Sequence, residues 1–325
     1  MNICNTNTWY LCDSVNNIDF FHSFLSLKKG THNSHAYTVS RPVPFGTGWV
    51  LCQDNSIFSQ LEKGVRLLDL RFKSPSHFGH GPALTADLTT VSNDLVEFML
   101  EHPGQVVICL VRTLPNFESS NDNDCSMCTS IHSTCTNDHS EFDPRKALAQ
   151  AVDKAISNQM NQDHYQQLGV RRPHVKIIGD TIKCQSTLAN TTLGHLTNRK
   201  RHGAILIDHW NNWRGSWHQT KDCAPRHVLA KCKEWAGHRQ TRNYSKKNRP
   251  QLLEFIVTID EGPVREMIKL AFTHSIRSIS NQMHDLARKE RIWNASIVSN
   301  IQAAIFDYVS DEVLLDIISL NLKGA

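Results

Sequence analysis

The sequence has no long hydrophobic run. None of its apolar stretches approaches the roughly 18 uninterrupted residues of a membrane-spanning helix. Its opening segment, MNICNTNTWYLCDSVNN, lacks both the basic start and the apolar middle of a secretory signal. The chain also lacks an internal repeat and a proline-rich linker. We therefore expect a cytoplasmic, monomeric protein, with peripheral contact to a membrane and secretion both left open.

Length and composition indicate a large globular core. The chain has 325 residues, of which 40% are hydrophobic, together with 15 glycines and 11 prolines. This length is long for one ordinary domain, but α/β barrels reach it undivided. Composition alone therefore leaves one barrel and two separate domains as alternatives.

The charge is weakly basic and unevenly distributed. The net charge is +4, and basic residues concentrate in the segments 197–203 and 239–250. Such segments can meet nucleic acid or an acidic membrane, or they can be two solvated loops. Of these, we expect a membrane surface as the partner and no nucleic acid.

A polar, cysteine-rich segment interrupts the middle of the chain. Cys125, Cys128, His132, Cys135 and His139 have ligand types that zinc uses, but their spacing matches no standard zinc finger. A disulfide staple and a disordered insertion are the alternatives. We treat about 113–145 as an insertion of undetermined role.

Short apolar runs rich in β-branched residues alternate with longer helical patterns. Nearly continuous apolar runs are typical of parallel strands covered on both faces. Strands are expected at 24–28, 65–72, 106–112, 175–179, 204–208, 253–259 and 303–308. Helices are expected at 56–64, 94–104, 145–169, 224–237, 263–290 and 311–324. This alternation predicts an α/β fold, a single distorted (β/α) barrel.

Polar residues stand where several of these strands end. They are His32, Asp69, Arg71, His80, Arg112 and Asp307. Catalytic residues of such barrels lie at the carboxyl ends of the strands. Histidines, a fixed positive charge and a carboxylate suit phosphoryl transfer, which needs a base, an acid and a cation for the phosphate. Chance placement is the alternative, because the chain has 18 histidines.

Four segments carry a resemblance to a known family. They are GTHNSH around His32, the stretch from Trp49 to Arg71, the stretch from His80 to Leu110, and IFDYVSDEVLLDIISLN from Ile305. They resemble the X domain of the phosphatidylinositol-specific phospholipase C family, in its single-domain, bacterial-like and X-domain-containing members. The resemblance covers 24–112 and the last part of the chain; between these it is only architectural.

The resemblance implies a fold and a reaction. The fold is a distorted TIM barrel, here a single catalytic domain over 1–325. The reaction is cleavage of phosphatidylinositol, or of a related glycosylated inositol lipid, into diacylglycerol and a cyclic inositol phosphate. The attacking group is the 2-hydroxyl of the substrate's own inositol, so the enzyme supplies a base rather than a nucleophile.

Matching positions imply the roles. His32 is the expected base, Asp307 its carboxylate partner, His80 the acid for the leaving diacylglycerol oxygen, and Arg71 the phosphate ligand. Asn33 follows the first histidine, where bacterial members carry aspartate and calcium-using animal members carry asparagine. The plainer alternatives are a loop histidine, a helix cap at Asp307 and an Arg71 that pairs with Asp69 as scaffold.

Further substrate contacts are expected at five positions: Asp69, Arg112, Lys176, Asp222 and Trp210. Each charged residue could equally be surface charge. Trp210, Trp213 and Trp217 follow the strand at 204–208, where they could enter a lipid interface or pack as one helical face in the core.

No cofactor is expected, and no calcium in particular. The calcium-using members carry E-x-D in the strand where this chain has Asp69, Leu70 and Arg71. An arginine at the second acidic position places a fixed cation where the ion would lie. Two other functions remain as alternatives: a catalytically inactive X domain that binds membranes or proteins, and a metal-dependent glycerophosphodiesterase on a related barrel.

Overall fold

The computed structural model describes most of the residues that were predicted to form the site. The described residues are 28–41, 47–115, 117, 142–167, 169–178, 203–215, 230, 251–256, 276–290, 303–308 and 311–313. The cysteine-rich cluster at 124–139, both basic segments, Trp217 and Asp222 lie outside the described residues, as does most of the helix expected at 224–237.

Parallel strands form the centre of the fold. Their order is β6-β7-β5-β2-β1-β10-β9-β8, and each neighbouring pair on this path is parallel. The strands are β1 (Lys28–Thr31), β2 (Leu67–Ser74), β5 (Val106–Thr113), β6 (His174–Ile177), β7 (Ala204–His209), β8 (Arg214–Gly215), β9 (Gln251–Phe255) and β10 (Ala303–Phe306). The first and last of these strands in the sequence, β1 and β10, are therefore neighbours. This arrangement agrees with the predicted α/β barrel class.

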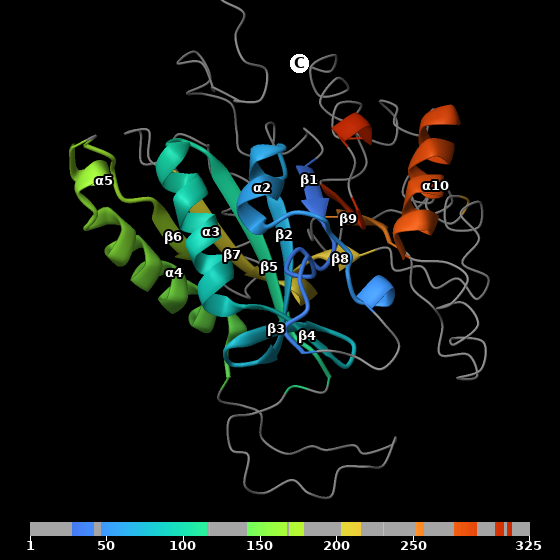
Figure 1. Cartoon of the computed structure of the whole chain (residues 1–325), viewed down its shortest axis with the longest axis horizontal. Coiled ribbons are helices and arrows are strands. Elements are labelled where there is room, and N and C mark those ends of the chain that lie inside the picture. The colour runs from blue at the N-terminus through green and yellow to red at the C-terminus, as the bar shows by residue number, and fades with distance from the viewer. Residues whose placement is uncertain are drawn as a thin grey trace, which may run out of the picture.

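Helices cover the outer face of the sheet (Figure 1). They are α2 (Ile57–Glu62), α3 (Leu88–Glu101), α4 (Pro144–Met160), α5 (Asp163–Gln167) and α10 (Ile276–Lys289), with a short 3-10 helix η2 at Thr47–Trp49 and another, η3, at Trp210–Asn212. Ser56, Asp87 and Asp143 each cap a helix by accepting a backbone N–H bond. α4 also has a proline in its first turn, a position where the missing N–H costs nothing.

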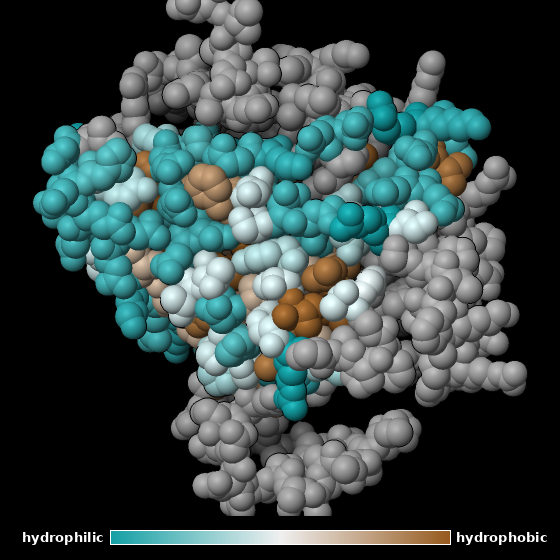
Figure 2. Space-filling model, in the orientation of Figure 1, coloured by the Kyte–Doolittle hydropathy of each residue, from teal (hydrophilic) through white to brown (hydrophobic). Residues whose placement is uncertain are grey.

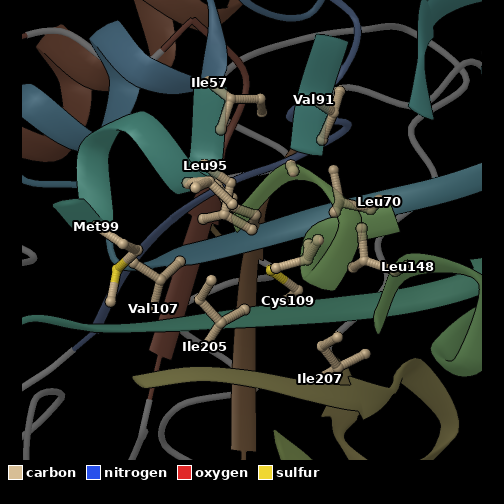
Figure 3. Close-up of a cluster of buried hydrophobic side chains, with 14 of the residues drawn as sticks. Ile57, Leu70, Val91, Leu95, Met99, Val107, Cys109, Leu148, Ile205 and Ile207 are labelled. Carbon is tan, nitrogen blue, oxygen red and sulfur yellow. The ribbon is translucent and has the colours of Figure 1, made fainter. Parts of the chain in front are cut away.

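Side chains alternate between the two faces of the strands. On β2, β5 and β7, the side chains of Leu68, Leu70, Phe72, Val107, Cys109, Val111, Ile205 and Ile207 join the core beneath α2, α3 and α4 (Figure 3). The intervening residues Leu67, Ile108, Leu110, Ala204, Leu206 and Ile305 form a second cluster on the opposite face. Because the period is 2, the side chains of Asp69, Arg71, Arg112, Asp208 and Asp307 fall on that opposite face, at or beyond the level where β1 ends. The inner face is thus apolar at one end and charged at the other.

Gly30 lets β1 fit between its two neighbours. A Cβ added at this position would lie 2.7 Å from Ile305 Cγ2 and 2.8 Å from Leu67 Cδ2. Such contacts are closer than packed carbons tolerate, so a larger residue would push β1 away from β10 or β2. This close packing sets the spacing of the strand ends that carry the site.

Three features differ from the sequence expectations. The first strand occupies Lys28–Thr31 and ends directly before His32, whereas it was expected at 24–28, of which 24–27 lie outside the described residues. A hairpin of β3 (His77–His80) and β4 (Ala83–Asp87) extends antiparallel from β2. Gly81, with φ of 55°, forms its turn, a conformation that glycine adopts without strain. The helix expected at 145–169 is divided into α4 and α5.

The surface over the outer helices is mainly hydrophilic, with small apolar patches (Figure 2). Within the described ranges, no helix has the length and apolar character needed to cross a bilayer.

Candidate active site

The ends of three adjacent strands bring the predicted site together. β1 lies between β2 and β10, with Thr31 paired to Leu68 and to Phe306. His32 follows β1, Asp307 follows β10, and Asp69 and Arg71 lie on β2 just beyond the residues that pair with β1. Residues far apart in the sequence therefore meet at one edge of the sheet.

His32 and Asp307 form a buried pair. His32 Nδ1 lies 2.6 Å from Asp307 Oδ1. The other ring nitrogen, Nε2, has no hydrogen-bond partner among the described residues, and Asp69 Oδ2 is 3.9 Å away. Burial, and then the positive charge of Arg71, hold the pKa of His32 well below its usual value. His32 is therefore neutral near pH 7, with an Nε2 that can accept a proton.

Asp69 and Arg71 form the second buried pair. Arg71 Nη2 lies 2.7 Å from Asp69 Oδ2, and Arg71 Nε donates to the same oxygen at 2.9 Å. The backbone N–H of Asn33 also donates to Asp69 Oδ2, at 3.0 Å. Burial alone would raise the pKa of Asp69, but the positive charge of Arg71 outweighs it and the net pKa is lowered. The expected scaffold pairing of Arg71 is thus present, and it fixes the guanidinium at the site.

His80 reaches the same site from the β3–β4 hairpin. Its ring centroid is 6.3 Å from that of His32, with the two rings nearly perpendicular. His80 Nδ1 donates to the Val50 carbonyl oxygen over 2.8 Å. Burial lowers the pKa of His80, and the Val50 bond partly opposes this shift. Since Nδ1 is the donor, Nε2 is the atom through which His80 can exchange a proton with a ligand.

Trp210 lies between the site and the core. Its ring faces the Arg112 guanidinium at 4.6 Å and that of Arg71 at 5.5 Å, both within cation–π range. Trp210 and Trp213 are only 9% and 4% exposed and belong to the inner apolar cluster. Of the two expected alternatives, a lipid interface and packing in the core, these two tryptophans therefore have the core position.

Lys176 is not brought to the site. It lies exposed on β6, where it pairs with Leu206 of β7. Asp222 lies outside the described residues. Both remain predictions from the resemblance alone.

Asn33 has a left-handed backbone, with φ of 42°, which asparagine tolerates better than most residues. Its side-chain amide nitrogen points to Cys52 Sγ at 3.6 Å, and its Oδ1 has no partner in the described part of the chain. The Asn33 amide therefore contacts the Cys52 thiol rather than either catalytic histidine.

Two residues of the site were missed in the sequence. Gln53 donates from Nε2 to the carbonyl oxygens of His32, at 2.8 Å, and Phe306, at 2.9 Å, and so ties the ends of β1 and β10 together. Cys52 is fully buried, with Sγ 3.5 Å from His80 Nδ1. Burial, and next the charge of Asp307, raise the pKa of this thiol well above its usual value. Both residues lie within the stretch from Trp49 to Arg71 that carries the resemblance, and this position is the one sequence feature that could have identified them as site residues.

Comparisons with known proteins agree with this geometry. A curated relative, the 1-phosphatidylinositol phosphodiesterase of Listeria monocytogenes, is 29% identical over 100 residues, a stretch that spans 29% of this chain and 30% of the relative. No family model matches the chain.

Solved structures extend the similarity over nearly the whole length. The phosphatidylinositol-specific phospholipase C of Listeria monocytogenes superposes with a TM-score of 0.56 at 15% identity, covering 97% of this chain and 98% of that one. A phosphatidylinositol-specific phospholipase C of Staphylococcus aureus gives a TM-score of 0.55 at 14% identity, covering 97% of each chain. The predicted barrel fold is thereby confirmed. Local sequence and overall fold both bear out the resemblance of this chain to the phosphatidylinositol-specific phospholipase C family.

Proposed function

We propose that this protein is a phospholipase C that cleaves the phosphodiester bond of phosphatidylinositol or of a glycosylated inositol lipid. The products are diacylglycerol and a cyclic inositol phosphate. The observation that carries the proposal is the pair of histidines, with ring centroids 6.3 Å apart, beside a buried Asp69–Arg71 pair, in a fold shared with enzymes of this name.

His32 acts as the general base in this proposal. The bond from Nδ1 to Asp307 fixes the tautomer in which Nε2 carries the lone pair. Nε2 takes the proton of the inositol 2-hydroxyl as its oxygen attacks phosphorus, and the Asp307 carboxylate stabilises the resulting imidazolium. Asp69, 3.9 Å from the same nitrogen, adds a second negative charge near the developing cation.

Arg71 binds the phosphate. Asp69 engages its Nε and Nη2, so Nη1 is the remaining nitrogen that can donate to a non-bridging oxygen. The guanidinium keeps its charge at physiological pH, which stabilises the negative charge that builds up on the phosphate in the transition state. Arg112 lies over the ring of Trp210, which Arg71 also contacts, and it adds a second positive charge near the phosphate.

His80 acts as the general acid. Its Nδ1–H is already bound to the Val50 carbonyl, so a protonated His80 presents Nε2–H to the leaving diacylglycerol oxygen. This backbone bond stabilises the protonated ring, whereas burial makes it a stronger acid than a free imidazolium. Base and acid then act on opposite sides of one phosphorus.

The proposal needs no metal ion. A calcium site is built from six to eight oxygens, including carboxylates that are not already neutralised. The carboxylate nearest the phosphate position, Asp69, is paired with Arg71 and bonded to the Asn33 amide. Arg71 supplies the positive charge that calcium would otherwise provide.

The accompanying proposals concern the whole chain. They are one catalytic domain over 1–325, a monomer, peripheral contact with an inositol-lipid surface, and no binding of nucleic acid.

The test is lipid cleavage by the purified chain in excess chelator. Vesicles that contain phosphatidylinositol are expected to release diacylglycerol, and vesicles of phosphatidylcholine alone are not. Cyclic inositol phosphate among the first products supports attack by the inositol hydroxyl. Binding to the vesicles without any cleavage would instead favour the inactive, lipid-binding alternative.

A further inference from the structure

One cluster of potential metal ligands lies within the site, and it joins Cys52, which the reaction just proposed does not use, to His32 and Asp307. A ring nitrogen of His32, the Sγ of Cys52 and a carboxylate oxygen of Asp307 lie within 4.8 Å of one another, and all three residues are buried. It is the one such group of three in the part of the chain that the structure describes. Its donors are one nitrogen, one sulfur and one oxygen.

These donor types select the metal. Thiolate and imidazole favour zinc and related borderline ions, whereas calcium and magnesium require oxygen ligands. In a tetrahedral zinc site, bonds of about 2.0–2.3 Å place ligand atoms roughly 3.4–3.7 Å apart. His32 Nδ1 and Asp307 Oδ1, now 2.6 Å apart, would separate by about 1 Å to reach that spacing.

Two further groups are placed to complete the site. A histidine that binds a metal through one nitrogen usually donates its other N–H to a carboxylate. If Nδ1 binds the ion, Nε2–H points toward Asp69 Oδ2, which is 3.9 Å away. Asn33 is fully buried beside the thiol, with Nδ2 3.6 Å from Sγ, and its Oδ1 has no partner among the described residues. A rotation of this amide would turn the oxygen toward the ion as a fourth ligand.

We propose that His32, Cys52 and Asp307 bind Zn²⁺, and that the bound ion inhibits the enzyme. On binding, the Cys52 thiol releases its proton to solvent and the His32 proton moves from Nδ1 to Nε2. The ion then lies between His32 and Asp307, and Nε2 can no longer accept a proton from the substrate. The inhibition, although not the binding, rests on the proposed phospholipase function.

Metal binding can be measured without the reaction. Co²⁺ is titrated into the metal-free chain, because a cobalt–thiolate bond gives a near-ultraviolet charge-transfer band and Zn²⁺ abolishes it by displacement. We expect the band in the natural chain and in Cys109→Ala, whose thiol is also fully buried but lies on β5 in the outer core. Cys52→Ala and Cys52→Ser should both lack it.

The cysteines at 125, 128 and 135 are a second source of thiolate ligands. The titration is therefore repeated with all three changed to serine, where the band that depends on Cys52 should persist. With the three serines in place, a band that survives Cys52→Ala, or the absence of any band while Cys52 is intact, would overturn the site.

Inhibition is then measured on phosphatidylinositol vesicles. Zn²⁺ should abolish cleavage and chelator should restore it, while Cys52→Ala should raise the inhibitory Zn²⁺ concentration by at least about tenfold. Equal inhibition of Cys52→Ala and Cys109→Ala contradicts the proposal. A Cys52-dependent cobalt band in a chain that never cleaves lipid supports the metal site and counts against the proposed function instead.

Discussion

Two neighbouring parts of the sheet end in buried aspartates, but their surroundings differ. At the active site, Asp69 on β2 and Asp307 after β10 face Arg71 and His32, which are charged or titratable. At the end of β7, Asp208 accepts hydrogen bonds from Asn212 Nδ2 at 2.7 Å and Trp213 Nε1 at 2.8 Å, and both donors are neutral. The partner, rather than burial or position on the strand, separates a reactive carboxylate from a structural one.

The electrostatics of the two regions confirm this contrast. Burial raises the pKa of Asp208, and its neutral donors offset only part of the shift. The pKa of Asp69 is lowered despite burial, because the positive charge of Arg71 is nearby. We therefore expect substitutions at the active site to change activity, and substitutions at the end of β7 to change stability.

The largest effect is expected at the two histidines. His32→Ala and His80→Ala should each lower turnover by roughly 100-fold to 10,000-fold, because each removes a proton-transfer group. Circular dichroism and thermal unfolding should show that both variants remain folded.

A substrate with a good leaving group separates the two histidine roles. Its leaving oxygen needs no proton, so it should restore turnover to His80→Ala and leave His32→Ala inactive. Equal rescue of both variants would show that base and acid are assigned wrongly.

Arg71→Lys should lower kcat/KM by about 100-fold. A lysine ammonium keeps the charge but cannot hold Asp69 and a phosphate oxygen with one planar group. Steady-state kinetics in excess chelator measure the loss. Restoration by added calcium would contradict the view that Arg71 takes the place of a metal.

Asp307→Asn and Asp208→Asn form a matched pair. At Asp307 the amide favours the wrong tautomer of His32, so kcat should fall at least about tenfold with little change in stability. At Asp208 the amide nitrogen meets other donors, so the free energy of unfolding should fall by about 1–3 kcal/mol while the folded protein keeps its specific activity. Urea unfolding and vesicle assays on both variants test the contrast, and the reverse assignment of effects would refute it.

The smallest effect concerns pH. His32 must be neutral and His80 protonated, so kcat/KM should be highest above the pKa of His32 and below that of His80. Both pKa values are lowered by burial, which places the optimum below the ordinary histidine pKa of about 6.5. A pH–rate profile with its maximum well above pH 7 would show that burial does not lower the pKa values of these two histidines.

Much of this arrangement was predictable from sequence. The apolar runs at 65–72, 106–112 and 204–208 gave the strands because fully covered parallel strands are continuously apolar. The period of 2 then placed Asp69 and Arg71 on one face. The pairing of His32 with Asp307 was expected only through the family resemblance, since no local pattern connects residues so distant in the chain.

The remaining features depend on contacts that no local pattern encodes. The β3–β4 hairpin was not expected, because HFGH and ALTAD are short and do not alternate clearly. The burial of Cys52 against Asn33 and His80 results from how the segment after η2 crosses the strand ends. Such loop geometry is determined by tertiary packing.

The most direct test is the vesicle assay of the natural chain and His32→Ala side by side, in excess chelator. The account predicts that the natural chain releases diacylglycerol and cyclic inositol phosphate from phosphatidylinositol, and that His32→Ala binds the same vesicles but releases neither at a comparable rate. The account would be contradicted if both proteins cleaved the lipid at similar rates, or if neither cleaved it until a metal ion was added.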